Sequence, residues 1–200
     1  MENMSDVLSF LWAALALLLA ENVVFARGIG TTLGISVTRG TKYVVLYALG
    51  VTLMSVVASI PAWFLHQLLK GLSLYPVIEP FGFTLVLTAV YLLAHFVLRF
   101  ASKVMYPRYS TEIAHMSFNC VAMAVLLIST RQRMGFGDTL LFALGTGLSF
   151  LVAALFLLEG QKRLAATNLP QSFSGLPAML LYVGIISMAI YGFTGHALPF

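Results

Sequence analysis

The sequence predicts an all-α integral membrane protein with six membrane segments, of which the first and fourth are broken half-helices. Hydrophobic residues make up 60% of the 200 residues, charged residues only 9%, and the mean hydropathy is +0.96. A soluble domain of this size cannot bury so much apolar surface. Six apolar segments follow one another, and most reach the roughly 20 residues that a helical crossing requires. They span residues 7–26, 43–69, 79–101, 113–130, 138–158 and 176–195.

The first segment is interrupted by polar residues. Its apolar run, Val7–Ala20, is too short for a crossing and ends at Glu21 and Asn22. An ionised carboxylate near hydrocarbon costs about 3 kcal/mol, so Glu21 is expected to face protein or a water-filled cavity. Glycines follow from Gly28 onward and lower the helix propensity there. We therefore expect a helix that enters the membrane and ends partway, as in the binding sites of many transporters.

The fourth segment has a similar defect, because His115, Ser117 and Asn119 fall in its first half. Each broken segment is followed by two uninterrupted ones. Since three crossings per half reverse the direction of the second half, the pattern predicts two inverted three-helix repeats. The expected organisation is a single membrane domain over residues 1–200, with pseudo-repeats at about 1–104 and 105–200.

The distribution of Lys and Arg predicts the orientation in the membrane. Of the 11 basic residues, about eight lie beside the odd-numbered connections between segments, and about three beside the even-numbered ones. Those three are Lys70, Arg131 and Arg133. Because basic connections stay in the cytoplasm, both termini are expected on the non-cytoplasmic side.

Small residues and prolines predict where helices pack and where they end. Small residues inside the predicted spans allow close helix approach; these are Ser55, Ser59, Gly145 and Gly147. Pro61 interrupts the second span. Other prolines are expected in loops, where they remove no helix hydrogen bond; these are Pro76, Pro80, Pro107 and Pro170.

Several classes of function are excluded by the composition. Cys120 is the single cysteine, which excludes an intrachain disulfide and a metal site built from several cysteines of this chain. No basic cluster alternates with aromatic residues, so nucleic-acid binding is not expected. The sequence contains no nucleotide-binding glycine loop, catalytic triad or carboxylate pair. We interpret His66, His95 and His115 as structural, because their spacing is not that of metal ligands.

The motifs at the two breaks and near the C-terminus resemble those of the Rnf/Nqr membrane subunit family, in its RnfA/NqrE-like branch. Glu21-Asn22, Gly30 and Val37-Thr38-Arg39 are similar to the first family signature, and the stretch 117–122, Ser-Phe-Asn-Cys-Val-Ala, to the second. The last third also follows the family order, with its Leu-Pro pair, a glycine, a final apolar span and Gly-Phe-Thr-Gly at 192–195. The resemblance covers nearly the whole chain.

This resemblance implies a function in electron transport. In the family, six-helix subunits pair with oppositely oriented homologues within a complex of the prokaryotic cytoplasmic membrane. That complex couples electron flow from carriers such as ferredoxin or NADH to the movement of Na⁺ or H⁺. Cysteines of the two partners hold an iron–sulfur cluster between the broken helices. The chain would then be a non-catalytic subunit of an ion-translocating oxidoreductase.

One departure from the family pattern affects the expected cluster. The first family cysteine falls on Thr32, whose neutral hydroxyl binds iron weakly compared with a thiolate. Cys120 supplies one ligand, whereas a two-iron centre is usually held by four cysteines. The centre is therefore altered, completed by another group, or absent.

Two functional hypotheses follow. The first is a membrane subunit of an Rnf/Nqr-type complex, with Cys120 as the iron–sulfur ligand. The second is a non-redox membrane transport or scaffold protein of the same fold. In it, Glu21, Asn22 and Asn119 form a cation site at the helix breaks. The two asparagines have a further interpretation, in which they satisfy backbone groups that the breaks leave free.

Overall fold

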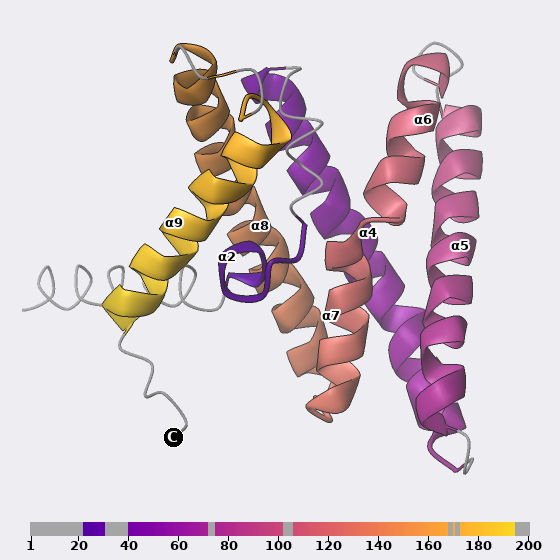
Figure 1. The fold of residues 1–200 in the computed structure, drawn as a ribbon. Helices are drawn as coiled ribbons and strands as arrows, with labels where there is room; N and C mark the ends of the chain where they lie inside the picture. The colour runs from indigo at the N-terminus through magenta and orange to yellow at the C-terminus, as the bar shows by residue number, and fades with distance from the viewer. Residues whose placement is uncertain are drawn as a thin grey trace, which may run out of the picture. The chain divides into compact units, whose positions relative to one another are not determined.

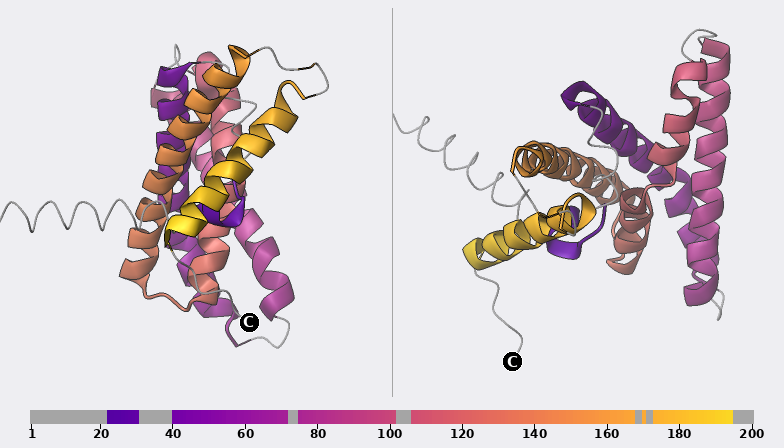
Figure 2. Two further views of the ribbon diagram at one scale, coloured as in Figure 1. Left: turned by 60° about the vertical axis from the view of Figure 1, so that its left-hand side comes forward. Right: turned by 45° about the horizontal axis from the view of Figure 1, so that its top comes forward.

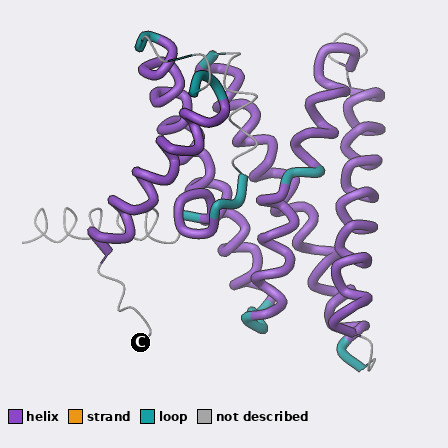
Figure 3. The backbone as a smooth tube through the Cα atoms, in the orientation of Figure 1, coloured by secondary structure: helices purple, strands orange, loops and turns teal. Residues whose placement is uncertain are grey.

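The computed structural model describes residues 22–30, 40–71, 75–101, 106–167, 170 and 173–194, which form helices joined by turns (Figure 1). Within this part of the chain there is no β-strand (Figure 3). The helices are α2 (Val23–Arg27), α4 (Thr41–Leu69), α5 (Tyr75–Ala101), α6 (Tyr106–Ser117), α7 (Cys120–Arg131), α8 (Phe136–Ala165) and α9 (Leu176–Thr194). The all-α prediction is confirmed for these residues.

Four stretches are long and apolar enough to cross a membrane, and a shorter apolar helix follows them. The four are Thr41–Leu69, Val77–Phe100, Tyr109–Arg131 and Phe136–Ala165, and the shorter one is Leu176–Gly192. Large apolar side chains remain exposed on these helices, as expected where helices face lipid. A multi-pass membrane protein is thus confirmed. Of the predicted first segment, only residues 22–26 belong to the described part of the chain.

The predicted break in the fourth segment is present. α6 ends at Ser117, and α7 begins at Cys120, after a turn at Phe118 and Asn119 (Figures 1 and 3). The helix before the break begins at Tyr106, earlier than the apolar segment predicted. This part of the chain is rich in polar residues such as Ser110, Thr111 and Glu112, so it forms a helix without forming an apolar run.

The proline prediction is wrong at three positions. Pro76 and Pro107 are the second residues of α5 and α6, and Pro80 lies inside α5. The first turn of a helix has N–H groups without intrahelical partners, so proline is accepted there at no cost in hydrogen bonds. Pro170 lies outside the helices, as predicted.

The chain divides into two compact units, which we describe separately. The first contains residues 1–45 and 149–200. In it α2 packs against α9, and the ring of Phe25 meets that of Phe156 of α8 edge-on, with centroids 6.2 Å apart. Gly160 lets α8 approach α9 closely, because a Cβ atom there would lie 2.2 Å from a ring carbon of Tyr182.

The second unit contains residues 46–148. In it α5 packs along α6 and α7, and Figure 2 shows α5 and α6 side by side. His95 Nε2 of α5 lies 2.6 Å from Tyr106 Oη of α6, which is consistent with a structural role for this histidine. The rings of Trp63 of α4 and Phe136 of α8 are in edge-to-face contact at 5.4 Å.

Candidate functional site

Asn119 caps the helix that follows the break in the second unit. Its backbone is extended, and its side-chain Oδ1 accepts a hydrogen bond of 2.8 Å from the Val121 N–H. Asn is among the preferred residues at this position, since its oxygen satisfies an N–H group that has no partner within the helix. Asn119 is only 4% exposed. An apolar residue here would leave that N–H group buried without a partner.

Tyr47 of α4 joins the two helices that flank the break. Its hydroxyl donates to the backbone carbonyl of His115 in α6 at 3.1 Å. The same hydroxyl accepts from Asn119 Nδ2 at 3.0 Å. One buried side chain therefore satisfies a carbonyl at the end of α6 and the cap residue of α7. Such a network fixes the geometry of non-helical backbone at a depth where water is excluded.

Asn22 has the same role in the first unit. Its Oδ1 accepts from the N–H groups of Val24 at 2.9 Å and Phe25 at 3.4 Å, at the start of α2. Its Nδ2 donates to the carbonyl of Ser149 in α8 at 2.7 Å. α2 then ends at Gly28, whose φ of 67° is in the left-handed region that favours glycine. The side chain of Asn22 is fully buried.

The two asparagines therefore perform equivalent local functions in separate units. In each, the amide oxygen caps a short helix and the amide nitrogen bonds to a long helix. Both oxygens are already engaged by backbone N–H groups. This geometry favours the interpretation that Asn22 and Asn119 satisfy backbone groups freed by the breaks. Glu21, the third residue of the hypothetical cation site, lies outside the described residues.

Cys120 is the first residue of α7, and its thiol is exposed. The Sγ atom lies 3.7 Å from Asn119 Oδ1, so the cap residue also positions the thiol. No group of three or more His, Cys, Asp or Glu side chains able to hold a metal ion occurs among the described residues. Thr32 is outside this part of the chain. With one cysteine in the sequence, the donor set of this chain does not fit a complete iron–sulfur centre.

Sequence reasoning did not find the partners of the two asparagines. Tyr47 lies within an uninterrupted apolar helix, and Ser149 contributes only its backbone carbonyl. Neither residue has a sequence signal that relates it to a break. Ser117 is fully buried beside the break, and its hydroxyl has no hydrogen-bond partner among the described residues.

Comparison with known proteins gives a match over nearly the whole chain. Residues 10–197 match the model of the family described as Rnf-Nqr subunit, membrane protein. The RnfA protein of the ion-translocating oxidoreductase complex of Syntrophotalea carbinolica is 26% identical, over 88% of this chain and 92% of its own length.

Two further relatives carry more specific names. A component of the proton-translocating ferredoxin:NAD(+) oxidoreductase complex of Clostridium ljungdahlii is 23% identical, over 94% of this chain and 97% of its own length. A component of the Na(+)-translocating ferredoxin:NAD(+) oxidoreductase complex of Acetobacterium woodii is also 23% identical, over 96% of this chain and 100% of its own length.

Proposed function

The chain belongs to the Rnf-Nqr subunit family of membrane proteins, and we propose that it is a membrane subunit of an ion-translocating electron-transport complex. The observation that carries this proposal is the extent of the match. The relatives named as subunits of such complexes align over nearly their full length with nearly all of this chain. The membrane segments and the region of the Asn119 break fall inside the matched residues. The complex would be linked to ferredoxin or NADH and lie in the cytoplasmic membrane of a prokaryote.

The transported ion differs among relatives of equal similarity. One relative at 23% identity is named for protons and another for sodium. The proposal therefore names an ion-translocating complex without assigning the ion to this chain.

The proposed architecture is a pair of inverted three-helix repeats with six membrane segments in all. Two features of the described residues support it. Asn22 and Asn119 each cap a short helix at a break. Each short helix is followed by two further helices, α4 and α5 in one case and α8 and α9 in the other. An inverted homologous subunit is the proposed partner, because half-helices leave backbone groups that need protein cover.

Cys120 is the proposed contribution of this chain to a redox centre. Its exposed thiol at the start of α7 is available to one iron ion of a cluster whose other ligands come from a partner subunit. When bound, such a cluster supplies one-electron transfer. The residues of this chain position the thiol, since Asn119 fixes both the first turn of α7 and the Sγ atom.

The test of this role is purification of the complex with its partner subunits, followed by iron analysis and electron paramagnetic resonance after reduction. We expect iron and a signal that Cys120→Ser removes or alters. Thr32→Cys should increase iron retention, because it restores a thiolate at the family position.

The alternative is a non-redox transport or scaffold protein with a cation site at Glu21, Asn22 and Asn119. The substitution at Thr32 favours it, since this chain lacks one family cysteine. An intact complex without iron, whose coupled activity is unchanged by Cys120→Ser, would support this alternative and contradict the redox role of Cys120.

A further inference from the structure

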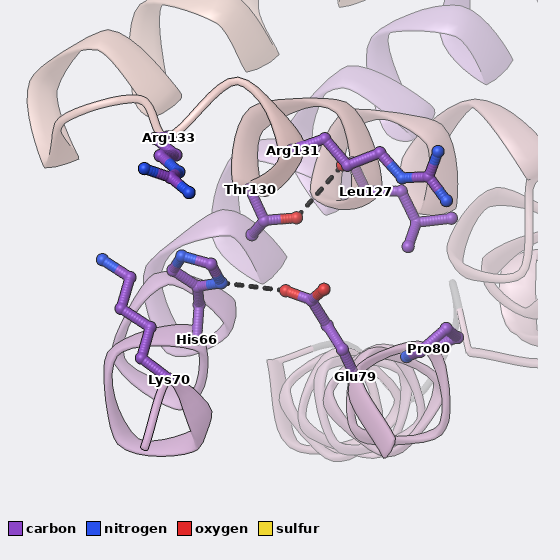
Figure 4. A pocket seen from close by; sticks show the side chains of 8 residues that line it. All are labelled: His66, Lys70, Glu79, Pro80, Leu127, Thr130, Arg131 and Arg133. Carbon is purple, nitrogen blue, oxygen red and sulfur yellow. Dashed lines mark hydrogen bonds and ion pairs between the residues drawn. The ribbon is translucent and has the colours of Figure 1, made fainter. Parts of the chain in front are cut away.

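A cavity of about 670 Å³ lies in the second unit, away from the Asn119 break (Figure 4). It is lined by the ends of α4 and α7 and by the first part of α5. Three basic residues contribute to its walls, Lys70, Arg131 and Arg133. Figure 4 shows Lys70 and Arg133 near His66, and Arg131 nearer Glu79.

These three residues are the ones that the orientation of the protein does not explain. The remaining Lys and Arg residues of the chain lie beside the odd-numbered connections, where basic residues set the membrane topology. Lys70, Arg131 and Arg133 lie beside even-numbered connections, separated by about 60 residues of sequence, yet all three line one cavity. Their convergence indicates a local function for positive charge.

Arg133 occupies a backbone position that favours glycine. Its φ is 52°, in the left-handed region. The N–H groups of Arg133 and Met134 bond to the carbonyls of Thr130 and Ser129, at 3.0 and 3.1 Å, which is the pattern of a Schellman turn at the end of α7. A residue with a Cβ atom is strained at this position, whereas glycine is not. The presence of arginine is explained if its charge is needed in the cavity.

The charge of the cavity selects the sign of its ligand. Glu79 is the one carboxylate among the described residues that line it, and it is buried against His66, with 2.9 Å between Oε1 and Nδ1. Three cationic side chains against one carboxylate leave the walls net positive. This charge disfavours a metal cation or hydronium ion and favours an anion.

The surface beside the cavity is apolar and exposed. Leu68 precedes Lys70 by two residues and is 77% exposed. Val77 and Phe81, two residues before and after Glu79, are 63% and 71% exposed. All three lie on predicted membrane-spanning helices. A ligand with an anionic head and apolar chains matches both the cavity and this adjoining surface.

We propose that this cavity binds the phosphodiester headgroup of an anionic phospholipid, with Lys70, Arg131 and Arg133 around the phosphate and the acyl chains along the exposed faces of α4 and α5. Basic pockets between membrane helices bind such headgroups by charge-assisted hydrogen bonds. The proposal does not depend on electron transfer by the complex.

The test measures lipid binding by native mass spectrometry of the full-length chain, purified in mild detergent with the subunits that accompany it. The ligands are phosphatidylglycerol, phosphatidylcholine with the same acyl chains, and inorganic phosphate. The variants are Arg133→Gly and Lys70→Gln. Lys162→Gln is the matched control, because Lys162 is an exposed basic residue of α8 outside the cavity.

We expect phosphatidylglycerol to bind more tightly than phosphatidylcholine. Each cavity variant should weaken phosphatidylglycerol binding about fivefold, and the control less than twofold. Arg133→Gly is informative because glycine relieves the backbone strain, so the variant should melt no lower than the wild type. If it does melt lower, Arg133→Asn, which tolerates the same backbone conformation, takes its place.

Three results would overturn the proposal. The first is equal binding of the two lipids. The second is binding of phosphatidylglycerol by the cavity variants within twofold of the wild type. The third is displacement of phosphatidylglycerol by an equal concentration of inorganic phosphate, which would assign the cavity to a soluble anion.

Discussion

Among single residues, Asn119 and Tyr47 have the most connected roles at the described break. Asn119→Ala removes the cap of α7 and the donor to the Tyr47 hydroxyl. Loss of an N-cap costs about 1 kcal/mol, and a buried polar group left without its partner costs about 1–3 kcal/mol. We therefore expect Asn119→Ala to lower the free energy of unfolding by about 2–3 kcal/mol, measured by denaturant titration in detergent.

A double-mutant cycle isolates the bond between the two side chains. Tyr47→Phe removes the hydroxyl and leaves the His115 carbonyl without this donor. Because the two residues share one network, their effects should be less than additive, with a coupling of about 1 kcal/mol or more. Additive losses would show that the Asn119–Tyr47 hydrogen bond contributes nothing to the stability of the break.

Single-residue features of the site were predictable where a polar residue interrupts an apolar run. Asn22, Asn119 and Cys120 stand out in the sequence for that reason. Tyr47 was not predictable, because its partner is 72 residues away and no periodicity links the two. The ion pair of His66 and Glu79 was missed for a similar reason, since it joins two helices across a connection.

At the level of helices, close packing at Gly147 gives a matched prediction. A Cβ atom at Gly147 of α8 would lie 2.3 Å from the Thr52 methyl carbon of α4, whereas one at Gly145 would meet nothing within 4 Å. We expect Gly147→Ala to destabilise the protein by about 1–3 kcal/mol through overpacking. Gly145→Ala should be neutral or slightly stabilising, because alanine has the higher helix propensity.

Thermal unfolding in detergent measures both glycine variants under the same conditions. Equal melting temperatures for Gly145→Ala and Gly147→Ala would contradict the close approach of α4 and α8 at Thr52. The result also distinguishes the two glycines that the sequence assigned together to helix packing.

Long apolar runs predicted the positions of α4, α5 and α9 to within a few residues. α8 extends beyond the predicted end at residue 158 to Ala165. Its last turns are charged, and Glu159 pairs with Arg163 at 3.2 Å along the helix surface. Such pairs support a helix without apolar residues, so hydropathy alone ends the segment too early. α6 was missed over its first turns for the same reason.

For the whole molecule, the orientation in the membrane remains a prediction from the distribution of Lys and Arg. Single cysteines introduced at residues 3 and 198 in a Cys120→Ser background should react with an impermeant maleimide from the non-cytoplasmic side. Intact cells and inverted vesicles provide the two directions of labelling. Reaction of either position from the cytoplasmic side alone would contradict the proposed topology.

The central claim is that this chain is a required subunit of an ion-translocating electron-transport complex. The most direct measurement is ion uptake into inverted membrane vesicles, driven by reduced ferredoxin or NADH. Vesicles are compared from cells that contain the chain, lack it, or carry it again on a plasmid. We predict that uptake is lost without the chain and restored with it. Uptake that continues unchanged in vesicles without the chain, while the other subunits are present, would contradict the claim.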